Sequence, residues 1–132
     1  MAQLQSTAVT GSMNVSGSFE VFGTTVVGAP TSLTKDGSNV FNIDLATNTN
    51  FVLNAAGAYT LNVIVPSYAV AQSGAFIIKN TSTTTPGALP ANLKTPNGQS
   101  IAFETDSGDI SVLSYLVVDV NTVVVNYIGN FG

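Results

Sequence analysis

The sequence contains no histidine, cysteine, tryptophan or arginine, and these absences remove most catalytic chemistry. Without histidine there is no imidazole general base, no Ser-His-Asp triad and no histidine-ligated metal. Without cysteine there is no disulfide, no thiolate nucleophile and no thiolate metal ligand. Neither glycine-rich nucleotide-binding motif, GxGxxG or GxxxxGK[ST], is present. We therefore expect a protein that is not an enzyme and that holds no cofactor.

Charge is also scarce, at 8% of the residues against about 25% in an ordinary soluble domain. The basic residues are Lys35, Lys79 and Lys94, and the formal net charge is -4. Three lysines are too few to follow a phosphate backbone, so we expect no nucleic-acid partner.

No apolar run approaches the roughly 18 residues that span a bilayer, and the first residues lack the basic and apolar regions of a secretory signal. We therefore expect no membrane partner.

Apolar and uncharged polar residues make up most of the chain. Hydrophobic residues account for 45%, beside 16 Thr, 13 Ser and 13 Asn. A surface of uncharged polar groups suits a permanent protein interface, because unpaired charges are costly to desolvate there. The composition therefore predicts association with other protein chains.

Apolar and polar residues alternate along much of the sequence, which places every second side chain on one face of a strand. The alternation is clear at 12–22, 41–45 and 59–65, and shorter strands are predicted near 24–27, 51–53, 75–79, 99–104, 110–118 and 122–128. Gly- and Asn-containing turn signals separate them. No stretch carries an apolar stripe of helical period, so at most one helical turn is expected, within 66–75. The fold class predicted is all-β, a small antiparallel β-sandwich or barrel.

The chain divides into an N-terminal extended arm, residues 1–28, and a β head domain, residues 29–132. The arm has a single charged residue, Glu20, and too few large apolar groups to fold alone. Its apolar face needs a partner surface, which either the chain's own head or a neighbouring subunit could supply. We expect exchange between subunits. The predicted oligomer interface of the arm consists of Met13, Val15, Phe19 and Val21.

Three further features have both a functional and a purely structural interpretation. The acidic turn at 104–109 offers oxygen ligands at alternate positions around a glycine, as a calcium loop does, but it lacks the terminal glutamate. Its carboxylates Glu104, Asp106 and Asp109 cluster around one turn, and glycosidases use two carboxylates. A solvated hairpin tip is expected instead. The polar segment 80–97 has the length of a functional loop, or is a solvated connection. The four tyrosines could form a sugar platform, although tyrosine in strands more often fills a core or interface. They are Tyr59, Tyr68, Tyr115 and Tyr127.

Several phrases resemble proteins of tailed-bacteriophage virions. Residues 107–132 resemble the closing hairpin of tail-fibre heads, and 39–45 and 57–63 resemble earlier strands of the same small β head. Residues 10–18 are similar to the Gly-Ser-x-Asn-Val-Thr-Gly-Ser phrases of fibre and decoration proteins, including those of phages that infect cyanobacteria. Residues 80–98 depart from the fibre heads, because Thr-Pro-Gly-Ala-Leu-Pro replaces their aromatic-Pro-Gly-Gly phrase.

This resemblance implies a homotrimeric virion structural protein. One head and one arm fit a capsid decoration, or cement, protein better than a fibre, which also needs a shaft. The alternative is the tip of a tail fibre or head fibre that binds the host cell surface. The partners implied are other copies of the chain and the major capsid protein or other virion proteins. The expected location is the exterior of the virion, after assembly in the host cytoplasm.

Overall fold

The computed structural model describes residues 29–132, so the four arm residues Met13, Val15, Phe19 and Val21 lie outside the described part. The described residues form strands and two short 3-10 turns, with no α-helix among them. The prediction of an all-β domain is confirmed, and the single helical turn expected within 66–75 is η1. The elements are β1 (Thr31–Leu33), β2 (Val40–Asp44), β3 (Asn50–Ile64), η1 (Ser67–Ala69), β4 (Ser73–Pro86), β5 (Leu93–Lys94), η2 (Pro96–Gly98), β6 (Ile110–Asp119) and β7 (Thr122–Phe131).

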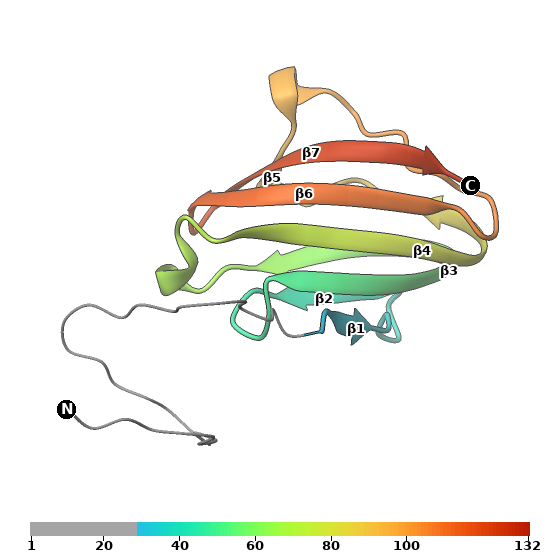
Figure 1. Ribbon diagram of the computed structural model, residues 1–132, viewed down its shortest axis with the longest axis horizontal. Coiled ribbons are helices and arrows are strands. Elements are labelled where there is room, and N and C mark those ends of the chain that lie inside the picture. The colour runs from blue at the N-terminus through green and yellow to red at the C-terminus, as the bar shows by residue number, and fades with distance from the viewer. Residues whose placement is uncertain (1–28) are drawn as a thin grey trace, which may run out of the picture.

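The first four strands stack in parallel as successive turns of the chain. β1 pairs with the first half of β3, β2 pairs with its second half, and β3 pairs with β4. Thr31 lies beside Phe51 and Val40 beside Thr60, so each residue of β1 and β2 is paired with the β3 residue 20 positions later. In Figure 1, β3 runs along the front of the molecule and then returns behind it, next to β2. Each turn therefore contributes one segment to a front layer and one to a back layer.

The reversal of β3 is centred on Gly57, whose φ of 63° lies in the left-handed region that glycine adopts without steric cost. Lys35, in the preceding turn, donates from its Nζ to the carbonyl oxygens of Ala56 at 2.6 Å and Ala58 at 2.8 Å. These carbonyls flank the glycine, so the ammonium group holds the bend from outside. The bend lets the two halves of one strand face a shared core.

Side-chain hydrogen bonds join neighbouring turns in the back layer. The N–H groups of Val40 and Ser38 donate to Oδ1 of Asp36, which lowers the pKa of that carboxyl group and fixes the turn before β2. Nδ2 of Asn42 donates to the other Asp36 oxygen, and Nδ2 of Asn62 donates to Oδ1 of Asn42 at 2.8 Å. Asparagines at the same position in successive turns therefore form a short ladder.

The hairpin of β6 and β7 completes the front layer. β6 pairs antiparallel with β4 and with β7, and β5 pairs parallel with β7, which gives the strand order β1-β3-β4-β6-β7-β5. Antiparallel pairing, which the alternation led us to expect throughout, is thus confined to β4, β6 and β7. The other strands pair in parallel because each turn crosses to the back layer before it returns to the front, so no helix is needed for the crossover.

One hydrophobic cluster fills the space between the layers. Segment 87–105 covers the back of the hairpin, and its Leu89, Leu93, Ile101 and Phe103 pack into this cluster. Residues 99–104 were predicted as a strand, and this prediction is wrong, because they form no strand and pair with none. Their apolar side chains nevertheless alternate in direction, with Ile101 and Phe103 toward the core. Residues 80–86, predicted as part of a loop, belong to β4. The fully buried large side chains are Phe41, Ile43, Phe51, Leu53, Phe76, Ile78, Leu113, Val117 and Val123.

Gly74, at the start of β4, is in contact with the carbonyl group of Thr49, and a Cβ at this position would overlap the Thr49 oxygen. Because the obstacle is backbone, it cannot rotate away. We predict that Gly74→Ala lowers the free energy of unfolding by roughly 1–3 kcal/mol, as overpacking does. Chemical denaturation measures this change. Gly37→Ala is the control, because its added Cβ meets no atom within 4 Å, and equal losses in the two variants would contradict the packing argument.

Candidate functional site

The outer surface of the front layer is an apolar sheet face. Outward side chains of neighbouring strands line up across the sheet, because Val52 is paired with Ile77, Ile77 with Val112, and Val112 with Ile128. A second pair, Leu116 and Val124, lies nearer the hairpin turn. We call this surface the outer face. Its large hydrophobic residues that are at least a third exposed are Leu116, Val118, Val124, Ile128 and Phe131.

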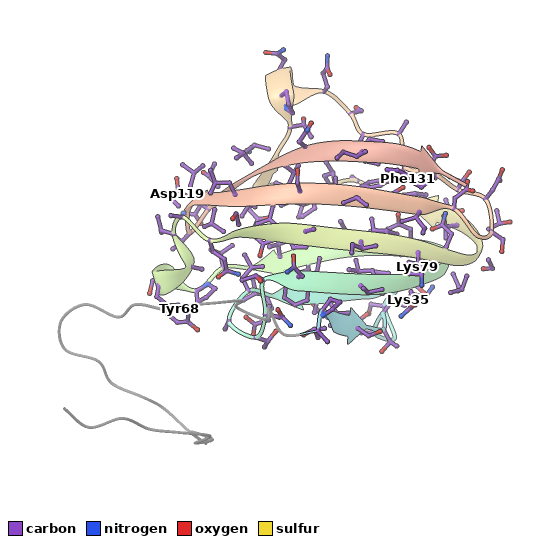
Figure 2. The ribbon with its side chains drawn as sticks, in the orientation of Figure 1. Lys35, Tyr68, Lys79, Asp119 and Phe131 are labelled. Carbon is purple, nitrogen blue, oxygen red and sulfur yellow. The ribbon has the colours of Figure 1, made fainter. Side chains whose placement is uncertain are left out.

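Charged side chains are nearly missing from the outer face. Between the apolar rows lies an uncharged one, in which Ala75 is paired with Ser114 and Ser114 with Asn126. Figure 2 shows Lys79 and Phe131 toward one end of the strands and Asp119 at the other end, at the hairpin turn. The middle of the face therefore carries no charged group that would lose its hydration when another protein covers it.

The sequence holds a signal for this face that the alternation argument missed. Val117-Val118 and Val123-Val124-Val125 are continuous apolar runs, and the buried members, Val117, Val123 and Val125, point into the core. An uninterrupted apolar run in a strand means that both of its faces are apolar. The runs therefore indicate a strand with a second surface to cover.

Two hollows adjoin this region. A shallow depression of about 340 Å³ lies over Leu116 and Val124 and is bounded by Pro96 of η2. A larger groove of about 500 Å³ lies within segment 87–103, where Leu93, Ile101 and Phe103 contribute apolar lining and Lys94 is the charged residue. Neither hollow is lined by an Asp or Glu residue.

The acidic turn is organised by Asn80, a buried residue of β4 that the sequence did not single out. Its Nδ2 donates to the carbonyl oxygens of Glu104 and Asp106, and its backbone pairs with Gly108 and Asp109. The turn's carbonyl oxygens are thus engaged in hydrogen bonds within the protein. Within residues 29–132 no three acidic side chains gather closely enough to hold a metal ion.

The tyrosines are dispersed. Tyr59 and Tyr115 are buried and Tyr127 is partly buried, while Tyr68 on η1 is 75% exposed. Rings of Tyr59 and Tyr127 both pack edge-on against Phe103, and Tyr115 stacks on Phe76. Three of the four therefore fill the core, as expected, and they do not gather into a sugar platform.

Comparisons with protein-family models, with curated proteins and with solved structures find no match to the chain. Within the described residues there is no helix of the length and apolarity that a membrane span requires. Function must therefore be inferred from the residues themselves. The outer face is the candidate functional site, since it combines exposure, apolar character and a near absence of charge.

The two buried tyrosine hydroxyl groups differ in their partners. The Tyr115 hydroxyl donates to the Thr49 carbonyl at 2.8 Å and accepts from Nε2 of Gln72. The Tyr59 hydroxyl is buried without a hydrogen-bond partner. Burial, and to a lesser extent the Tyr127 hydroxyl, raises the pKa of Tyr59 to about 12.

We predict that Tyr59→Phe raises the free energy of unfolding by about 1 kcal/mol, because an unsatisfied buried group is removed, while Tyr115→Phe lowers it by a similar amount. Denaturant titration checks both. In the unfolded chain the Tyr59 hydroxyl loses its proton near its ordinary pKa of 10, whereas in the folded chain it does so only near 12. The free energy of unfolding therefore falls as pH rises from 10 to 12. This loss should be smaller in Tyr59→Phe. A destabilised Tyr59→Phe protein would show that the hydroxyl has a partner.

Proposed function

We propose that this chain is a non-enzymatic structural protein of a tailed-bacteriophage virion, a homotrimeric decoration protein that stabilises the capsid from outside. The observation that carries the proposal is the outer face, a broad apolar and nearly uncharged sheet surface. The virion assignment draws on the resemblance of residues 10–18, 39–45, 57–63 and 107–132 to phage fibre and decoration proteins. The partners proposed are other copies of the chain and the major capsid protein.

The exposed apolar side chains of the outer face supply free energy for association with another protein. Val124, Ile128 and Phe131 are 38%, 47% and 49% exposed. Full burial of such a side chain yields roughly 1.5–3 kcal/mol, so covering the exposed part of each contributes about 1 kcal/mol. Several residues together offset the loss of translational freedom on association. Each bound copy then favours the assembled shell by mass action.

A second candidate function is the tip of a tail fibre or head fibre that binds the host surface. The groove in segment 87–103 favours it, because concave sites with a few polar groups suit ligand recognition. Copy number separates the two functions. A decoration protein is present in proportion to the major capsid protein of purified particles, whereas a fibre tip is present in a small fixed number.

We predict that Ile128→Lys dissociates the trimer, because the charge lies on the outer face and would have to be desolvated in the contact. Light scattering should then give a folded monomer of 13.5 kDa, and decoration of particles should be lost. The matched control is Ile64→Lys, at a residue of β3 with nearly the same exposure, 46% against 47%, but in the back layer.

An unchanged trimer in the Ile128→Lys protein would exclude the outer face as the subunit contact. A protein that is monomeric before any substitution would contradict the trimer itself. Dissociation of both variants would show a general effect of added charge. Circular dichroism of each variant confirms that the β fold is retained, so that loss of assembly is not mistaken for loss of folding.

A further inference from the structure

The stack of turns has an open edge at its N-terminal end. Among the described residues, β1 and β2 each pair with β3 on one side and with no strand on the other. An unpaired strand edge presents backbone N–H and C=O groups that are ready to accept another strand. Ala29, the first described residue, lies two positions before β1. The edge is thus adjacent to the point where residues 1–28 join the head.

The paired turns share a sequence pattern at the same 20-residue spacing as their register. Leu33 is paired with Leu53, and Phe41 with Leu61. Gly37 precedes β2 by three residues, as Gly57 precedes Thr60, the partner of the first residue of β2. At these positions an apolar side chain or a glycine recurs from one turn to the next.

Residues 11–24 continue this pattern one period earlier. Met13 stands 20 positions before Leu33, Gly17 before Gly37, and Val21 before Phe41. The other two residues that alternation selected in the arm match the second turn but not the first. Val15 stands 40 positions before Ala55 and Phe19 stands 40 positions before Tyr59, both buried, whereas the intervening residues Lys35 and Asn39 are polar. All four residues thus stand 40 positions before buried residues of β3, with Gly17 in register with Gly37 and Gly57.

We propose that residues 11–24 pair in parallel with β1 and β2 of the same chain, as one further turn of the stack. The connection lengths favour the same chain over a neighbouring one. The link between β2, ending at Asp44, and β3, beginning at Asn50, spans residues 45–49. Residues 11–24 would be joined to β1, which begins at Thr31, by residues 25–30, one residue more. A segment in this register therefore reaches its own edge through a connection of nearly the same length.

The repeat also shows where the pattern changes. Phe22 stands 20 positions before Asn42, so the asparagine ladder of Asn42 and Asn62 ends at Asn42. Gly23 stands before Ile43, which is fully buried. The added turn therefore brings fewer buried atoms at its end than the turns that follow. The inference is independent of the virion function, because it concerns the fold of one chain.

Engineered disulfides test the register, since the chain has no cysteine to interfere. Ser32 is an exposed residue of β1 that is paired with Val52, and Ser12 is its counterpart one period earlier. Neighbouring strands lie about 4.8 Å apart, within the Cα separation of a disulfide. Full-length Ser12→Cys/Ser32→Cys protein should form an intramolecular disulfide on mild oxidation. The matched control is Ser18→Cys/Ser32→Cys, which is out of register and should give at least tenfold less.

A mixture of the two single-cysteine proteins, Ser12→Cys and Ser32→Cys, refolded together, separates the same chain from a neighbour. The proposal requires that residues 12 and 32 be joined within one chain and not between the mixed chains. A 12-to-32 disulfide between chains in the mixture would overturn it in favour of subunit exchange. Equal yields in the in-register and out-of-register double variants would overturn the pairing altogether. Mass spectrometry of the cross-linked peptides identifies each product.

Discussion

The reversal of the chain at Gly57 is the constraint on which the rest of the fold depends. It allows one strand to contribute to both layers, so that Phe51 and Leu61, ten positions apart in the sequence, belong to the same core. The bend is held by a lysine of the preceding turn rather than by its own residues. Correct stacking of the turns and correct bending of the strand therefore support one another, as expected of a sequence whose local and global preferences agree.

The strands could be predicted from the sequence because alternation is a local property of each segment. The alternation at 41–45 and 59–65 gave the inward residues of β2 and β3 correctly, as the burial of Phe41 and Leu61 shows. Which strands pair with one another could not be predicted in the same way, because pairing depends on the number of residues between segments. The common 20-residue spacing becomes visible only when the register of paired strands is known.

The candidate site was harder to predict than the fold. The sequence argument placed the interface in the arm, at Met13, Val15, Phe19 and Val21, which lie outside the described residues, so that interface stays a prediction. The outer face was missed because its residues, such as Leu116 and Val124, alternate with buried residues. The alternation argument considered only the side chains that it placed in the core. Ile101 and Phe103 show the opposite case, since their alternation reflects packing alone, without strand pairing.

The parallel stacking has a consequence for how such a chain can change in length. β1 and β2 both pair with β3 through a 20-residue offset, so a whole turn added or lost at the N-terminal edge leaves every remaining register intact. The opposite end does not allow this, because β6 runs antiparallel to β4 and reverses the direction of the sheet. The fold is therefore modular at one end and closed at the other. Duplication of a single turn is a route by which related chains of different length could arise without redesign of the core.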